Sequence, residues 1–215
     1  MAVDEGEMGA GAGRSERKRQ AVLAAATQTF LKSGYLGANM DEIAASSGVS
    51  KQTVYKHFGS KEALFIEIVT SMTGAADIRV HTAPADPETA EALRQFLFDY
   101  AYRQLKVVMT PALMQLRRLV IGEVSRFPDL ARVLYERGPQ RAMTVLSGIF
   151  GRLDARGLLN CPEPQLAATT FNWLAMAEPV NRAMLLGDGE LPTDAQLRAV
   201  ATEAVRVFLA AYGRS

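Results

Sequence analysis

The chain has 215 residues, of which 48% are hydrophobic, and a formal net charge of +1 at pH 7. This length and composition are typical of a globular protein with one or two domains. A single cysteine, Cys161, excludes a disulfide within the chain. No apolar run approaches the roughly 18 residues of a membrane span, and the N-terminus lacks a basic-then-apolar signal pattern. We therefore expect a cytoplasmic protein with no membrane partner.

Residues 1–13 are rich in glycine and alanine and are expected to be disordered, because they offer little apolar surface to bury. The cationic segment 14–19 follows and could either contact phosphates or remain merely solvated. Apolar residues at helical spacing then predict a first helix that ends near Lys32, before Gly34. The buried stripe of this helix would consist of Leu23, Ala26 and Phe30.

Residues 39–61, NMDEIAASSGVSKQTVYKHFGSK, predict two short helices joined by a tight turn. Asn39 can cap the first helix, and Ser50 can cap the second, which is expected over 51–58. Gly48 lies in the turn, where a left-handed backbone would strain other residues. The outward face of the second helix carries donors and cations that can bind base edges and phosphates in a DNA major groove. A helical hairpin with a merely solvated polar face is the alternative that this local pattern leaves open.

Positive charge is concentrated in the same region of the sequence. Residues 14–61 contain eight Lys and Arg against three acids, whereas the rest of the chain contains 16 against 20. A basic segment joined to a mildly acidic remainder is typical of a protein that touches nucleic acid with one end.

The rest of the sequence also predicts helices and shows no alternation typical of strands. A fourth helix should begin at Ser60, and a fifth should be capped by Asp86 with Pro87 as its first residue. Later helices are expected to begin at Pro111, Pro128, Pro139, Pro164 and, with a Thr193–Gln196 capping box, after Thr193. We predict an all-α fold of nine to ten helices, with a DNA-binding domain over 14–61 and a second helical domain over 62–215.

Several short motifs between residues 17 and 69 occur together: Ala25-Ala26, Phe30, Gly34-Tyr35, Met40-Asp41-Glu42-Ile43-Ala44, Gly48-Val49-Ser50, Thr53-Val54-Tyr55, His57-Phe58 and Ser60-Lys61-Glu62-Ala63-Leu64. Together they resemble the helix-turn-helix domain of the TetR family of bacterial transcriptional regulators. Asn39 departs from the family, which often has threonine there, and Gln52 stands where a small residue is frequent. The resemblance implies DNA contacts by Asn39, Ser50, Lys51, Gln52, Thr53, Tyr55, Lys56, His57 and Lys61.

The same resemblance implies a C-terminal domain that dimerises and binds a small effector. The helices expected over 139–156 and 164–186 would pair with their symmetry mates, although their small residues could equally serve packing within one subunit. Segment 118–138 is similar to the ligand domain of a subgroup of the family. An apolar or amphipathic effector would be bound by residues that could also be ordinary core: Met72, Phe96, Tyr100, Met114, Arg117, Phe127, Met143, Phe171, Trp173 and Met176.

Enzymatic and metal-binding motifs are missing from the sequence. It has two histidines and one cysteine, and it contains no nucleophile elbow, P-loop or HExxH motif. We therefore expect no catalytic site, no metal and no cofactor. The prediction is a homodimeric, ligand-responsive repressor that binds a palindromic double-stranded DNA operator. An activator, a ligand-independent regulator, and a helical ligand-binding or interaction protein without DNA binding are the alternatives.

Overall fold

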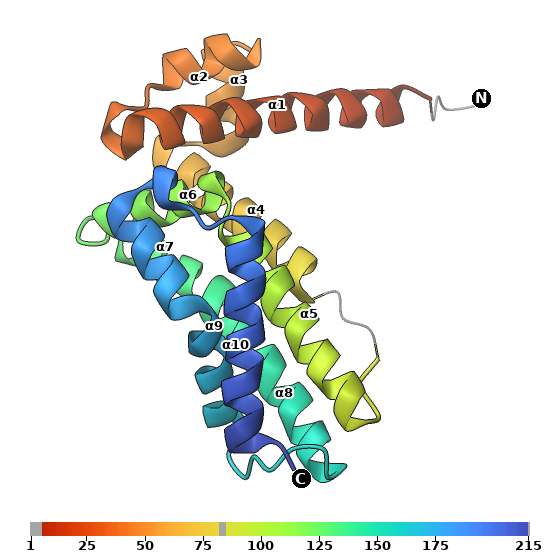
Figure 1. The fold of residues 1–215 in the computed structure, drawn as a ribbon. Coiled ribbons are helices and arrows are strands. Elements are labelled where there is room, and N and C mark those ends of the chain that lie inside the picture. Colours follow the sequence, from red (N-terminus) through yellow and green to blue (C-terminus); the bar gives the residue numbers. More distant parts are fainter. Residues whose placement is uncertain (1–5, 82–84, 215) are drawn as a thin grey trace. The chain divides into compact units, whose positions relative to one another are not determined.

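Helices make up the regular structure of the part of the chain that the computed structural model describes, namely residues 6–81 and 85–214, with side chains from residue 13 onward (Figure 1). One isolated antiparallel bridge joins Leu159 to Gly213. The predicted all-α fold is confirmed over these ranges. The chain divides into two compact units, Met1–Ser71 and Met72–Ser215.

The first unit contains α1 (Gly6–Gly37), α2 (Met40–Ser47), α3 (Lys51–Phe58) and the beginning of α4 (Lys61–His81). Helix α1 begins earlier than expected, so helix replaces the predicted disorder from residue 6 onward. Once a helix is nucleated, each added residue gains a hydrogen bond, and Glu, Met and Ala favour this extension, although the four glycines among residues 6–13 oppose it. Residues 1–5, which were also expected to be disordered, lie outside the described residues.

Gly34 interrupts α1 where the sequence predicted its end. Its backbone angles are φ 73° and ψ 174°, a region that is essentially restricted to glycine. The helix resumes for one turn as far as Gly37. The break turns the chain so that Tyr35 packs near Phe65, with 5.2 Å between ring centroids.

Apolar side chains from α1, α2, α3 and α4 form the core of the first unit. The predicted stripe of α1 is buried, with Phe30 1% exposed, and its ring lies 5.0 Å from that of Phe65. Ile43 of α2 and Val54 of α3 are fully buried. Burial of each such side chain contributes about 1.5–3 kcal/mol to folding, and it fixes the angle at which α3 leaves the core.

Among its described residues the second unit contains the end of α4, six further α-helices and two short helical turns. The predicted starts at Pro111, Pro128 and Pro164 are confirmed, and Thr193 and Gln196 form the predicted capping box. Helix α9 packs against α5, α8 and α10. The elements after α4 are α5 (Ala90–Val108), α6 (Pro111–Gly122), α7 (Pro128–Tyr135), a π-turn (Glu136–Gln140), α8 (Arg141–Ala155), α9 (Pro164–Leu186), a 3-10 turn (Asp188–Glu190) and α10 (Asp194–Tyr212).

The predicted start of α5 at Asp86 and Pro87 was wrong. Thr89 is the N-cap instead, and its hydroxyl accepts a hydrogen bond from the Ala92 N–H at 3.2 Å. The Asp86 carboxylate accepts two hydrogen bonds from the Arg152 guanidinium, at 2.7 and 2.9 Å. Asp86 is therefore bound by Arg152 of α8 and does not cap α5.

The junction between α7 and α8 also differs from the prediction of a helix that begins at Pro139. A π-turn, Glu136–Gln140, joins the two helices, and Pro139 lies inside it. Proline has no N–H to donate and its ring crowds the preceding turn. A wider turn accommodates it without ending the helical path, and such turns are frequent at functional sites.

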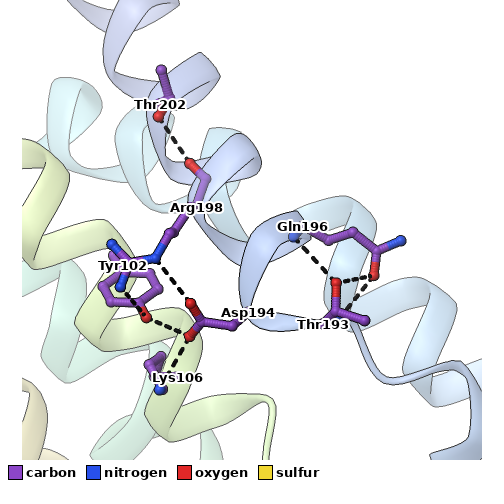
Figure 2. A network of polar contacts seen from close by, with 7 residues as sticks. All are labelled: Tyr102, Lys106, Thr193, Asp194, Gln196, Arg198 and Thr202. Carbon is purple, nitrogen blue, oxygen red and sulfur yellow. Dashed lines mark hydrogen bonds and ion pairs between the residues drawn. The ribbon is translucent and has the colours of Figure 1, made fainter.

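A polar network fastens the first turn of α10 to α5 (Figure 2). The Asp194 carboxylate accepts hydrogen bonds from Tyr102 at 2.5 Å, from Lys106 at 3.2 Å and from Arg198 at 2.9 Å. These three donors hold the pKa of Asp194 well below its usual range. The network therefore fixes the register between two helices that are far apart in the sequence.

Candidate nucleic-acid interface and internal cavity

Capping residues close in the sequence fix where α2 and α3 begin and end. The Asn39 side chain accepts from the Asp41 N–H at 2.8 Å, and Ser50 Oγ accepts from the Thr53 N–H at 3.2 Å. Gly48 ends α2 with φ 68° and ψ 24°, in the left-handed region that favours glycine. These features give a helix-turn-helix whose second helix is α3.

Helix α3 has one buried face and one exposed face. Val54 and Phe58 face the core, and Tyr55 is 41% exposed. Of the nine residues predicted to contact DNA, seven lie on α3 or at its N-cap, whereas Asn39 caps α2 and Lys61 begins α4. Exposed are Asn39, Ser50, Lys51, Gln52, Tyr55 and Lys56; half-buried are Thr53, His57 and Lys61.

Several of these side chains already have partners within the first unit. Lys51 Nζ lies 2.8 Å from Asp41 Oδ1, and this pairing raises the pKa of Lys51. Ser50 Oγ and Thr53 Oγ1 are 2.9 Å apart. Lys61 Nζ donates to the Leu36 carbonyl at 3.3 Å and lies 4.8 Å from the centre of the Tyr35 ring. Lys61 is thus held beside the helix-turn-helix by the segment that follows the Gly34 break.

The cationic segment 14–19 is partly used for structure. Arg19 donates to the Glu67 carboxylate at 2.6 Å, and its guanidinium lies 5.7 Å from the centre of the Phe58 ring. Arg17 donates to the Gly13 carbonyl at 3.1 Å. Arg19 therefore packs against the end of α3.

An internal cavity lies within the second unit, between α4, α5, α6, the π-turn and α9. The cavity has a volume of about 80 Å³, and apolar atoms form most of its wall. Of the ten residues predicted to form a pocket, four line it: Met114, Arg117, Trp173 and Met176.

The other six predicted pocket residues lie elsewhere. Phe96, Tyr100, Met143 and Phe171 are buried in the core, where the Phe171 ring lies 5.9 Å from Phe150 and 5.0 Å from Phe208. Met72 and Phe127 are half-buried outside the lining. The first four of these residues therefore occupy ordinary core positions, which was the alternative to a pocket.

Polar residues of the cavity wall were missed by the sequence reasoning. Gln104 and Asn172 are 4% and 2% exposed, and Gln104 Nε2 donates to Asn172 Oδ1 at 2.9 Å. Each stands at a helical position whose neighbours in the sequence are buried and apolar, such as Ala101 and Leu105 around Gln104. A polar amide within a buried apolar stripe was the signal that could have identified them.

A second polar group surrounds His81 at the end of α4. The Tyr100 hydroxyl lies 3.1 Å from His81 Nδ1, and His81 Nε2 lies 3.3 Å from Asp77 Oδ1. Arg141 Nε lies 3.4 Å from the same Asp77 oxygen. Burial lowers the pKa of His81 and raises that of Tyr100. Across the described ranges no three His, Cys, Asp or Glu side chains are grouped to hold a metal ion.

An apolar groove lies beside the cavity, along α6 and α9. It is lined by Ile121, Trp173, Ala177 and Leu185, among others. Large apolar side chains of α9 remain exposed in the single chain, including Leu166 at 54%, Trp173 at 40% and Leu185 at 75%. From residue 6 to 81 and from 85 to 214, no helix has the length and apolar character needed to span a membrane.

Known protein families match both units of the chain. The family described as bacterial regulatory proteins, tetR family, matches residues 22–68. The family described as AefR-like transcriptional repressor, C-terminal domain, matches residues 95–214, which is more than half of the chain.

Solved structures and curated relatives agree with these matches. A TetR-family transcriptional regulator from Mesorhizobium loti MAFF303099 is 36% identical, with a TM-score of 0.82 over 94% of this chain and 99% of that one. The flavonoid-responsive regulator FrrA is 30% identical, with a TM-score of 0.74 over 92% and 98%. The transcriptional repressor NicS of Pseudomonas putida KT2440 is 32% identical over 106 residues, 46% of this chain and 49% of NicS. That match spans about half the length of NicS.

Proposed function

Because this chain belongs to the TetR family of bacterial transcriptional regulators, we propose that it is a homodimeric cytoplasmic repressor that binds a palindromic operator. A small effector that enters the cavity of the second unit would release it from DNA. Its relatives are transcriptional regulators and not enzymes, so the proposed activity is the binding of DNA and of an effector.

The exposed face of α3 carries this proposal. Lys51, Gln52, Thr53 and Lys56 are our candidates for base-edge contacts, and Gln52 has the amide geometry that can bind adenine with two hydrogen bonds. Our candidates for phosphate contacts are Tyr55, His57 and Lys61, with Asn39 and Ser50 at the helix starts, where N–H groups favour anions.

The exposed apolar face of α9 supports pairing of two subunits. Large exposed apolar patches on a single chain mark interaction surfaces. A side chain at Gly148 of α8 would meet only the end of Arg152, at 3.8 Å, so the surface there is open to close approach by another helix. A two-fold dimer would place the two α3 helices about 34–36 Å apart, one turn of DNA.

The position of the cavity supports control by an effector. Five residues of α4 line it, namely Thr73, Ala76, Asp77, Val80 and His81, and the same helix begins at Lys61, next to the helix-turn-helix in the sequence. An effector that favours one position of α4 would shift the population toward dimers in which the spacing between the two α3 helices does not fit the operator. The responsiveness of FrrA to flavonoids supports a small, largely apolar effector here.

Binding to DNA from just upstream of the gene, measured by anisotropy of labelled DNA at several salt concentrations, tests the proposal. We expect a nanomolar complex with two subunits per palindrome and an affinity that falls steeply with salt. A Lys51→Gln, Lys56→Gln double variant should lose most of this binding. Arg206→Gln, which removes an exposed charge on α10, is the matched control and should retain it.

Affinity no greater than for random DNA, both at the upstream site and in a genome-wide selection of binding sites, would contradict operator recognition. If the operator is bound, a transcription assay with and without effector distinguishes a repressor from an activator.

A further inference from the structure

Arg117 of α6 is a cation in the cavity wall without a partner among the described residues. The structure shows no hydrogen bond or ion pair from its guanidinium to any of them, and burial lowers its pKa. Its neighbour Arg118 differs, because it donates to the Ala183 carbonyl at 2.9 Å and pairs with the Asp188 carboxylate. Arg117 is half-buried, and because a guanidinium stays protonated in proteins, its partly desolvated charge would gain from an anion.

Gln104 adds an unused hydrogen-bonding atom to the same wall. Its Nε2 is engaged by Asn172, while its buried Oε1 has no hydrogen-bond partner in the described part of the chain. Buried polar atoms are nearly always paired, and an exception calls for an explanation such as an absent ligand. A hydroxyl group on a ligand would supply the missing donor.

The remaining charges of the wall favour an anion as well. Among the described lining residues the one acid is Asp77. Its Oδ1 lies 3.3 Å from His81 Nε2 and 3.4 Å from Arg141 Nε, but like Gln104 Oε1 it accepts no hydrogen bond among the described residues, so a ligand hydroxyl could donate to either oxygen. Arg137 of the π-turn adds a second cation to the lining. A cationic ligand would therefore meet repulsion from Arg117 and Arg137.

The rest of the wall limits the size and character of the ligand. The side chains of Val108, Leu113, Met114, Trp173, Met176 and Val180 are apolar or aromatic. The cavity has a volume of about 80 Å³, less than the roughly 150 Å³ of a cavity that holds one benzene ring, and one side of it is open. A ligand with a single ring would therefore have to protrude through the open side or displace the flexible Met114 and Met176 side chains.

We propose that the cavity takes a hydroxylated aromatic or similarly compact carboxylic acid. Its carboxylate would be bound by Arg117, its ring would lie against the apolar wall, and its hydroxyl would donate to Gln104 Oε1. The inference rests on the proposed function, in which this cavity receives the effector, and it names the chemical class of that effector. Arg117 binds a planar carboxylate with two parallel hydrogen bonds, which a neutral ester cannot reproduce.

Calorimetric titration of the full chain with three probes tests this assignment. The probes are 4-hydroxybenzoate, its methyl ester, which removes the charge, and benzoate, which removes the hydroxyl. We expect the acid to bind at least tenfold more tightly than the ester, and several-fold more tightly than benzoate. Arg117→Met should abolish the preference for the acid, and Gln104→Leu should abolish the preference for the hydroxyl.

Two further variants keep the test independent of folding defects. Arg117→Lys retains the charge and should keep part of the acid preference, whereas Arg132→Met removes an exposed arginine of α7 outside the lining and should change nothing. Equal affinity for acid and ester, an acid preference that survives Arg117→Met, or no binding of any probe at millimolar concentration would overturn the assignment. Operator binding by the unliganded protein is measured in parallel, because its loss would count against the proposed function and not against the ligand class.

Discussion

Lys51 of α3 is bound by Asp41 of α2, with the ammonium nitrogen 2.8 and 3.1 Å from the two carboxylate oxygens. Both side chains are more than half exposed. The same lysine is a candidate for contact with DNA, so the Asp41 carboxylate competes with the nucleic acid for it. In the unbound protein the pairing also holds the long side chain close to the start of α3.

Asp41→Asn should increase affinity for DNA of any sequence by several-fold, because it frees Lys51 and removes a negative charge near the phosphates. The slope of log affinity against log salt should steepen by up to about 0.9, the value for one additional phosphate contact. Titrations of operator and random DNA measure both quantities. Glu42→Gln, an exposed acid of the same helix, is the control; an equal gain there would assign the effect to overall charge.

Gln52→Ala should change sequence preference at one base pair by about 1–3 kcal/mol, because it removes a pair of hydrogen bonds to a base edge. Affinities for a set of single-base operator variants measure this. Equal losses for every variant would show that Gln52 does not read a base.

Tyr55→Phe should instead weaken binding to all operator variants by the same factor, since a phosphate contact carries no sequence information. The same set of DNA duplexes provides the measurement. A preference that changed at a single base pair would place Tyr55 at a base edge.

Gly34→Ala should lower the free energy of unfolding of the first unit by about 1–3 kcal/mol, the cost of a strained backbone at a residue other than glycine. Apart from the adjacent backbone, no atom lies within 4 Å of the added methyl group, so the loss would come from the positive φ and not from a clash with packed side chains. Chemical denaturation followed by circular dichroism measures it. Gly13→Ala, at a helical position of α1 with equal space, should leave stability unchanged or slightly higher.

Asp86→Asn should reduce stability by about 0.5–1 kcal/mol at pH 7, as expected for an exposed bidentate pair with Arg152. Arg152 holds the pKa of Asp86 below its usual 3.8. The contribution is therefore fully present above the unfolded pKa and is lost progressively as the pH falls from there through the lower folded pKa. Denaturation midpoints between pH 2 and 8 check this, with Glu88→Gln as the control; a difference that does not shrink as the pH falls below about 4 would contradict the ionic origin.

The parts of the fold that follow from the sequence depend on residues close together in it. The bounds of α3, the Ser50 cap and the left-handed Gly48 each follow from atoms within a few positions along the chain. The capping box at Thr193 is equally local. Such features need no knowledge of the packing.

Several of the features that were wrong or missed depend on distant residues. Asp86 does not cap α5 because Arg152 on α8 holds it, and no local pattern contains that partner. Helical spacing indicated correctly that Tyr100 is buried, but it could not tell a core position from a cavity wall. Gln104 and Asn172 are 68 positions apart in the sequence, and their role as a hydrogen-bonded pair in the cavity wall is visible only once α5 and α9 pack together.

Trp173 lines both the cavity and the neighbouring groove of α9, and it is the only tryptophan of the sequence. Trp173 is 40% exposed in the single chain. The sequence therefore has its one indole fluorophore at the place where a bound effector and a second subunit would each change its surroundings. Ultraviolet emission from the unlabelled protein would follow both events, and diluting the protein at fixed effector would tell them apart.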